Sequence, residues 1–288
     1  MARAIGAEHV AVPLTAADFQ AILPRVIWHL DQPIGTASVA AEFALARAAR
    51  DHVTVVLGGQ GADEAFGGYV RHALLMAERH LADAPLLRDY HPLARVLWGA
   101  GMFTDPADRY VQLIHRGDGD AADLHATART LFSRHRESLV DQMGAVDFAT
   151  TFPSLILMND RAAAAYGLEN RTPFLDHRTV EFAFRLPATL KIRNLTTKVL
   201  LRRAARGIVP DAIVDRRDKK GLAVPVARWL HGELKHWAGE LADALSRRGI
   251  DIRPRADRGQ FDRTLFAKVS LELWFRTFID RAGDAPLS

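Results

Sequence analysis

Two neighbouring carboxylates that follow a glycine-rich turn are the first residues in this sequence whose types and spacing could do chemistry. Asp63 and Glu64 come directly after the segment Gly58-Gly59-Gln60-Gly61-Ala62. Glycines let the backbone turn sharply and allow a ligand to approach closely, and an acidic pair at such a turn could hold a divalent metal. The structural alternative is a helix start, where acidic side chains are favoured by the helix dipole. Spacing alone leaves both interpretations open.

Two further polar stretches could contribute to a site. Residues 167–176 (GLENRTPFLD) are polar and bounded by a proline, and they contain Glu169 and Arg171. Their alternative role is a linker in which Asp176 caps a helix over 176–185. Residues 215–222 (DRRDKKGL) place Lys219 and a second lysine side by side before a glycine. Such a charge run is more often a solvated face than a binding site.

The elements that must position these residues are predicted from apolar patterns. The β-branched run Val53–Leu57 predicts a strand buried on both faces, as in a parallel sheet, and open α/β sheets bind ligands at the carboxyl ends of their strands. His9–Pro13 predicts another short strand, and Thr15–His29 predicts a helix. Ser38 is a candidate N-cap for an alanine-rich helix that runs to about Arg50. The first seventy residues therefore indicate an α/β fold.

From Val70 to Ala165 the pattern is helical, with breaks at Ala84–Pro85, Thr104–Pro106 and Gly117–Asp120. The segment around Gly117–Asp120 superficially resembles a calcium loop but lacks the ligand spacing of an EF-hand, which favours a surface turn. Further helices are predicted over residues 152–166 and, near the C-terminus, over residues 260–281.

Composition narrows the function classes. The 288 residues suffice for a sizeable core, the chain has no cysteine, and no apolar run approaches the length of a membrane span. No signal-peptide pattern is present, so the cytoplasm is the expected location. The net charge is only +4, and the excess of 32 arginines over 6 lysines is spread along the chain. A nucleic-acid or membrane partner is therefore not expected.

Three separated stretches resemble the synthetase domain of glutamine-hydrolysing asparagine synthases. They are VVLGGQGADEAFGGY (Val55–Tyr69), YGLENRTPFLDHRTVEFAFRLP (Tyr166–Pro187) and TKVLLRRAARGIVPDAIVDRRDKKGLAVP (Thr197–Pro225), and LELWFRTFID near the C-terminus also fits. The resemblance covers essentially the whole chain in the same order. It implies an adenine-nucleotide α-hydrolase-like fold, in which a parallel sheet precedes a mostly helical region. Residues 1–288 would form one synthetase domain, with an incomplete α/β nucleotide-binding part over 1–69, a mainly helical part over 70–288 and no glutaminase domain.

The resemblance also implies an activity and its residues. ATP would adenylate the side-chain carboxylate of aspartate, and ammonia from a glutaminase domain or chain would displace AMP to give asparagine. Magnesium and basic groups would neutralise the polyphosphate. By position, Asp63 matches the magnesium-binding aspartate with Glu64 beside it, and Lys219 matches the lysine that contacts phosphate. The backbone of the turn would line the nucleotide pocket (Gly58, Gly59 and Gly61), and Glu169 and Arg171 would shape the active-site wall.

Two departures from the family pattern limit this expectation. Some members carry a glutamate where Gln60 stands, and a glutamine cannot take a proton. No SGGxDS-type pyrophosphate loop occurs in the sequence, and position 2 is Ala2 where the glutaminase domain would need a cysteine. We therefore expect an N-terminally truncated ligase domain with weak or no ATP–pyrophosphate exchange on its own. Two alternatives are amidation or cyclisation of another carboxylate, and a non-catalytic interaction module that retains the fold.

Overall fold

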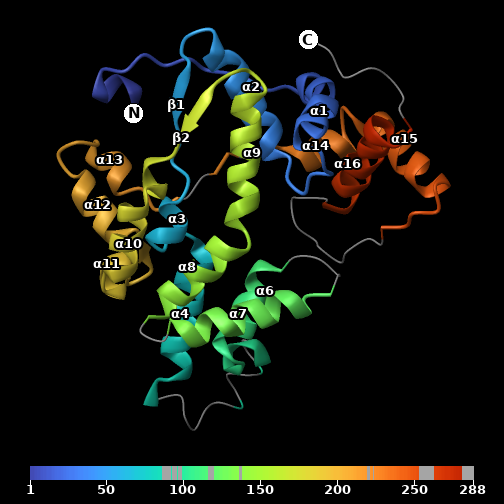
Figure 1. Cartoon of the computed structure of the whole chain (residues 1–288). Coiled ribbons are helices and arrows are strands. Elements are labelled where there is room, and N and C mark those ends of the chain that lie inside the picture. The colour runs from blue at the N-terminus through green and yellow to red at the C-terminus, as the bar shows by residue number, and fades with distance from the viewer. Residues whose placement is uncertain are drawn as a thin grey trace. The chain divides into compact units, whose positions relative to one another are not determined.

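A computed structural model describes residues 1–85, 92, 96, 99–115, 120–135, 138–218, 221, 222, 224–252 and 263–280 of the chain (Figure 1). The chain divides into two compact units. Unit 1 comprises residues 1–8, 57–155 and 172–218, and unit 2 comprises residues 9–56, 156–171 and 219–288. Both units are therefore built from segments that lie far apart in the sequence.

Unit 2 packs helices around a large apolar cluster. Helix α1 begins with a capping box in which Thr15 and Asp18 satisfy each other's backbone N–H groups. The fully buried Phe19 on α1 lies 5.5 Å from Trp229 and 6.3 Å from Phe266 between ring centroids. The helices of this unit are α1 (Ala16–Leu30), α2 (Ser38–Arg50), most of α9 (Phe152–Ala164), α14 (Val226–His231), α15 (Lys235–Arg247) and α16 (Arg263–Phe278).

Unit 1 is also mainly helical and has its own core, in which Tyr110, Met143 and Val146 are fully or almost fully buried. Helices α6, α7 and α8 pack in succession, and α8 also contacts the short helix α3. The described helices that lie wholly in this unit are η1 (Ala2–Ile5), α3 (Ala62–Ala65), α4 (Val70–Ala82), η3 (Ala100–Phe103), α6 (Pro106–Ile114), α7 (Ala122–Arg134), α8 (Leu139–Ala149), η4 (Pro173–Leu175), α10 (His177–Arg185), α11 (Ala188–Lys191), α12 (Val199–Ala205) and α13 (Asp211–Val214).

The strands are few and short in the part of the chain that the structure describes. Strand β1 (Val55–Leu57) pairs with β2 (Glu169–Arg171) in a small parallel sheet, next to which the N–H of Glu169 donates to the carbonyl of Thr54 at 2.9 Å. Strands β3 (Ile192–Arg193) and β4 (Thr196–Thr197) form an antiparallel hairpin. The protein is thus a mostly helical α/β structure with a small parallel sheet.

The helices agree with the sequence patterns better than the strands do. The helical interpretation of Val70–Ala165 is confirmed over the described residues of that range, and Asp176 caps α10 by accepting from the N–H of Arg178 at 2.9 Å. Ser38 is not a cap, because it is the first residue of α2 and Ala37 occupies the cap position. The turn predicted at Gly117–Asp120 lies almost wholly outside the described residues.

Two strand predictions were wrong in part, and one strand was not predicted. His9–Pro13 forms no strand, since it has no ladder partner within the described residues. Strand β1 forms, yet it is not buried on both faces: Val55 and Leu57 are exposed. The polar segment 167–176, for which no strand was predicted, contains β2, because a strand distant in sequence supplies its backbone partners.

Candidate functional site

The glycine-rich turn connects β1 to helix α3, as the sequence predicts. Gly61 adopts φ +92°, a conformation that favours glycine, and a Cβ atom there would lie 2.5 Å from Leu175 Cδ2. Gly59 is different, since it is exposed and no atom lies within 4 Å of the position its Cβ would occupy. Gly61 therefore serves the packing of the turn, whereas Gly59 leaves open space where a ligand could approach the backbone.

Asp63 has a cationic neighbour that sequence reasoning did not identify. The Nζ atom of Lys198 lies 3.0 Å from Asp63 Oδ1, and both side chains are about a quarter exposed. Gly68 permits this arrangement, because a Cβ there would overlap both side chains. Lys198 itself has φ +54° at the N-cap of α12. The pair leaves a carboxylate and an ammonium group together at a partly exposed position beside the turn.

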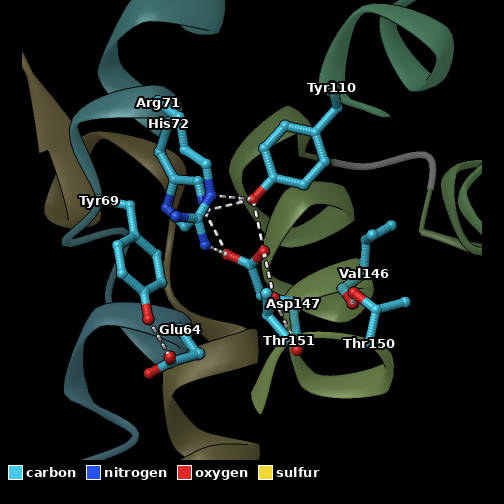
Figure 2. Close-up of polar contacts among 9 residues, drawn as sticks. All are labelled: Glu64, Tyr69, Arg71, His72, Tyr110, Val146, Asp147, Thr150 and Thr151. Atoms are coloured by element: carbon cyan, nitrogen blue, oxygen red, sulfur yellow. Dashed lines mark hydrogen bonds and ion pairs between the residues drawn. The ribbon is translucent and has the colours of Figure 1, made fainter. Parts of the chain in front are cut away.

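Glu64 points elsewhere. Its carboxylate is buried and accepts a hydrogen bond from the Tyr69 hydroxyl (Figure 2). Burial, together with this bond to a carboxylate, raises the pKa of Tyr69 far above its ordinary value. Tyr69 therefore remains a protonated donor, and the two adjacent acids of the turn have different environments.

A buried polar network lies beside Tyr69 and is centred on Asp147, which is fully buried on α8 (Figure 2). Its carboxylate accepts from Arg71 Nη2 at 2.8 Å, from His72 Nε2 at 2.8 Å and from the Tyr110 hydroxyl at 2.7 Å. Although burial would raise the pKa of Asp147, the bond from His72 and the charge of Arg71 hold it below its ordinary value. The carboxylate is therefore ionised and fully used as an acceptor.

His72 is neutral in this network. Burial lowers its pKa more strongly than the bond to Asp147 raises it. Because a carboxylate only accepts, the ring proton is on Nε2. The Nδ1 atom is buried without a hydrogen-bond partner among the described residues.

The network reaches the acidic turn through an aromatic stack. The Arg71 guanidinium lies 3.6 Å from the centroid of the Tyr69 ring, so that it contacts the ring face while bonding to Asp147. Tyr69 in turn holds Glu64, the residue next to Asp63. A continuous set of directional contacts thus connects the core of unit 1 to the first turn of α3.

The other predicted site residues lie in the turn, on β2 or outside the described residues. Gln60 is half-buried within the turn. Glu169 and Arg171 lie on β2 in unit 2, are exposed, and form an ion pair with each other at 2.6 Å. Lys219 lies outside the described residues. The structure therefore brings together Gly58, Gly59, Gln60, Gly61, Asp63 and Glu64 in one turn and adds Lys198 to them.

Asp63 and Glu64 differ as candidate ligands for magnesium. No group of three or more His, Cys, Asp or Glu side chains arranged to hold a metal occurs within the described ranges. Mg²⁺ is commonly bound by one or two carboxylates together with substrate phosphates and water. Asp63, partly exposed at the turn, fits that role, whereas the carboxylate of Glu64 is turned to Tyr69.

A family profile and individual relatives match this chain and point to the same family. The profile of the family described as asparagine synthase matches residues 1–274. A Mycobacterium tuberculosis protein named as a glutamine-hydrolysing asparagine synthetase is 34% identical over 98% of this chain and 48% of its own length. Asparagine synthetase [glutamine-hydrolyzing] 1 of Bacillus subtilis is 31% identical over 82% of this chain and 41% of its own. Amidase chry2 of Gibberella zeae is 24% identical over 81% of this chain and 42% of its own. The chain thus spans less than half the length of these relatives.

Proposed function

Because the chain belongs to the asparagine synthase family, we propose that it is the synthetase part of an ATP-dependent amide ligase. In this proposal ATP adenylates the side-chain carboxylate of aspartate with release of pyrophosphate, and ammonia derived from glutamine displaces AMP to give asparagine. A carboxylate is a poor electrophile until it is activated, so the nucleotide must be held and its charge neutralised before amination. An adenine-nucleotide α-hydrolase-like fold is part of the same proposal.

The observation that carries the proposal is the turn with its two charged neighbours. Gly59 leaves its backbone accessible, and Asp63 and Lys198 stand together beside the turn. The Lys198 ammonium is a compact charge that suits contact with a phosphate oxygen. In the same scheme Asp63 holds Mg²⁺, which neutralises phosphate charge when bound. Lys219 is the second proposed phosphate contact, and Glu169 belongs to the proposed wall of the site.

Gln60 favours a second candidate within the same chemistry. It stands at the centre of the turn where a glutamate could take a proton from an attacking amine, and an amide cannot do so. In this second candidate the acceptor is a carboxylate other than aspartate, which is amidated or cyclised. A group other than Gln60 then deprotonates the attacking amine.

The test is ATP–pyrophosphate exchange by the purified chain with Mg²⁺ and a panel of carboxylates. We expect weak or no exchange by the chain alone, and aspartate-dependent exchange when it is co-expressed with the part of the Mycobacterium tuberculosis relative outside the match. Asp63→Asn should abolish that exchange, whereas Asp83→Asn, at an exposed ion pair with Arg79, should leave it unchanged. Exchange with a carboxylate other than aspartate would favour the second candidate. Absence of exchange under every condition would exclude a ligase, and robust exchange by the chain alone would contradict the expectation of weak or no exchange.

A further inference from the structure

Lys198 reaches Asp63 from a strained backbone conformation. Its φ and ψ are +54° and +39°, in the left-handed region that residues other than glycine rarely adopt. Its ammonium nevertheless lies 3.0 Å from Asp63 Oδ1. Such a conformation persists only where the surrounding contacts determine it. The contacts that hold this backbone therefore decide where the ammonium lies.

Arg202, on α12, bonds to the peptide groups on both sides of Lys198. Its Nε donates to the carbonyl of Thr197 at 3.0 Å, and its backbone N–H donates to the carbonyl of Lys198 at 2.9 Å. Rotation of these two peptide groups defines φ and ψ of Lys198. The bond from the backbone N–H is an ordinary helical one that most residue types would make. The bond from Nε, in contrast, requires the arginine side chain.

The other end of the same guanidinium bonds to a segment farther along the chain. Arg202 Nη1 donates to the carbonyl of Val214, at the end of α13, and to the carbonyl of Arg216 at 2.9 Å. A guanidinium carries five N–H donors in a planar fork, so one half-buried side chain can reach both segments at once. Arg202 thus anchors the backbone beside Lys198 to the segment 214–216.

A second arginine already attaches α12 to the region of α13. Arg206, at the C-cap of α12, donates to Asp211 Oδ1 at 2.7 Å and bonds to the carboxylate of Asp215. These exposed bonds join side chains, whereas the three bonds of the Arg202 guanidinium go to backbone carbonyls. Attachment of α12 alone would be served by Arg206. The arginine at 202 adds control of the backbone next to Lys198.

We propose that Arg202 is a positioning residue, which holds the backbone of Lys198 in the conformation that directs its ammonium to Asp63. This role rests on the proposed function only in so far as Lys198 serves there as a phosphate contact. Arg202 itself touches no substrate and acts through Lys198. Because a lysine carries its charge on a flexible four-carbon chain, fixing the backbone beneath it reduces the freedom that is lost when phosphate binds.

Acetylation of the Lys198 amine in the purified chain, without nucleotide, tests this role. An ammonium held by a carboxylate reacts slowly, because it must leave the carboxylate and lose a proton before it attacks the reagent. Arg202→Gln and Asp63→Asn should each accelerate acetylation about fivefold, as expected for loss of a partly exposed ion pair. The double variant should react no faster than either single variant, because both remove the same interaction. Mass spectrometry of the peptide that contains Lys198 measures the rates.

Arg206→Gln is the matched control, since it loosens α12 from α13 without removing a bond at Thr197. Lys198 should be acetylated in this variant at the rate of the parent chain. Arg202→Lys keeps the charge but not the planar fork, so it should react as fast as Arg202→Gln, and it replaces that variant if Arg202→Gln does not fold. Unchanged hydrogen exchange of α6 and α8 shows that unit 1 remains folded.

Four results would overturn the role of Arg202. They are an unchanged rate in Arg202→Gln or Arg202→Lys, an unchanged rate in Asp63→Asn, equal acceleration in Arg206→Gln, and accelerations by Arg202→Gln and Asp63→Asn that multiply in the double variant. ATP–pyrophosphate exchange is measured separately in the co-expressed assembly. Absence of exchange together with the expected acetylation rates would refute the ligase while leaving Arg202 as the residue that places Lys198. Where exchange occurs, Arg202→Gln should raise the KM for pyrophosphate more than it lowers kcat.

Discussion

Among the described residues, unit 1 buries more polar and charged side chains than unit 2, in which Ser270 and Glu272 are buried. In unit 1 the interior holds Asp147, His72 and Lys191, each fully or almost fully buried and tied to a polar partner. In unit 2 the largest cluster is apolar and centres on aromatic and aliphatic side chains such as Phe19 and Trp229. Buried ion pairs add little net stability compared with apolar packing, but breaking one is costly.

This difference has a consequence for the candidate site. The directional bonds of unit 1 converge on helix α3, where Asp63 lies, through Arg71, Tyr69 and Glu64. Apolar packing does not fix orientation as sharply, because it has no preferred direction. We infer that unit 1 uses its polar interior to hold the acidic turn in one geometry, whereas the main cluster of unit 2 is made of apolar side chains.

The largest effect is expected at the centre of the polar network. Asp147→Asn removes the charge that balances Arg71 and one acceptor of a fully used carboxylate, so the free energy of unfolding should fall by about 3–5 kcal/mol. Hydrogen exchange should accelerate in α4, α6 and α8 of unit 1 and stay unchanged in α1 and α16 of unit 2. Urea unfolding with peptide-resolved exchange measures both.

Asp83→Asn is the matched control for that variant. Asp83 accepts from Arg79 at 3.0 Å on the exposed surface of unit 1, where an ion pair contributes about 1 kcal/mol or less. Equal losses for the two variants, or equal acceleration of exchange in both units after Asp147→Asn, would contradict the contrast between the units.

Local signals explain which parts of the fold were predictable. Helix α10 follows from Asp176 and the apolar pattern after it, because a cap and its helix are neighbours in sequence. Strand β2 was missed because its ladder partner, β1, lies far away along the chain. The prediction of a strand at His9–Pro13 was wrong because the segment has a strand-like pattern but no strand pairs with it in the described ranges.

The residues of the candidate site also divide into those that local sequence identifies and those that only folding brings together. The turn from Gly58 to Glu64 was identified because its glycines and acids are adjacent, and the structure places it between β1 and α3. Lys198 could not be identified, since neither its type nor its neighbours distinguish it from any other lysine and only folding brings it to Asp63. The roles of Lys219 and Glu169 stay predictions.

A second prediction concerns Glu42, a half-buried carboxyl of unit 2 whose pKa is strongly raised. Burial raises the pKa of Glu42 from 4.5 to about 7. Between these values the folded state holds a proton that the unfolded state releases, so stability is highest below pH 4.5 and falls as the pH rises through 7. Glu42→Gln should therefore stabilise unit 2 by up to about 3 kcal/mol at pH 8 and have almost no effect at pH 4. The same stabilisation at both pH values would show that ionisation of Glu42 is not the cause.

The pH dependence of unit 1 should have the opposite sign. The pKa of His72 is lowered by burial, so below its ordinary value of 6.5 the unfolded state takes up a proton that the folded state does not. Unit 1 should then lose stability as the pH falls from 7 to 5, with a limiting slope of about 1.4 kcal/mol per pH unit. Peptide-resolved exchange in the Glu42→Gln background would isolate this effect. A stability of unit 1 that rises or stays constant over that range would contradict a neutral buried His72.

The smallest effect on the free energy of unfolding is expected in the β3–β4 hairpin of unit 1, where the backbone conformation of the turn is strained. Asn194 and Leu195 connect the two strands with φ +48° and +60°. A two-residue hairpin turn with positive φ at both positions favours Asn-Gly, and a leucine there is strained. Since Leu195 is exposed and its side chain contributes little burial, Leu195→Gly should raise the free energy of unfolding by about 1 kcal/mol. Ile208→Gly, at an exposed residue without positive φ, should lower it slightly, because glycine there only increases the freedom of the unfolded chain. Thermal unfolding of both variants separates relief of backbone strain from simple removal of a surface side chain. Only relief of strain predicts that the free energy of unfolding rises in Leu195→Gly and falls in Ile208→Gly.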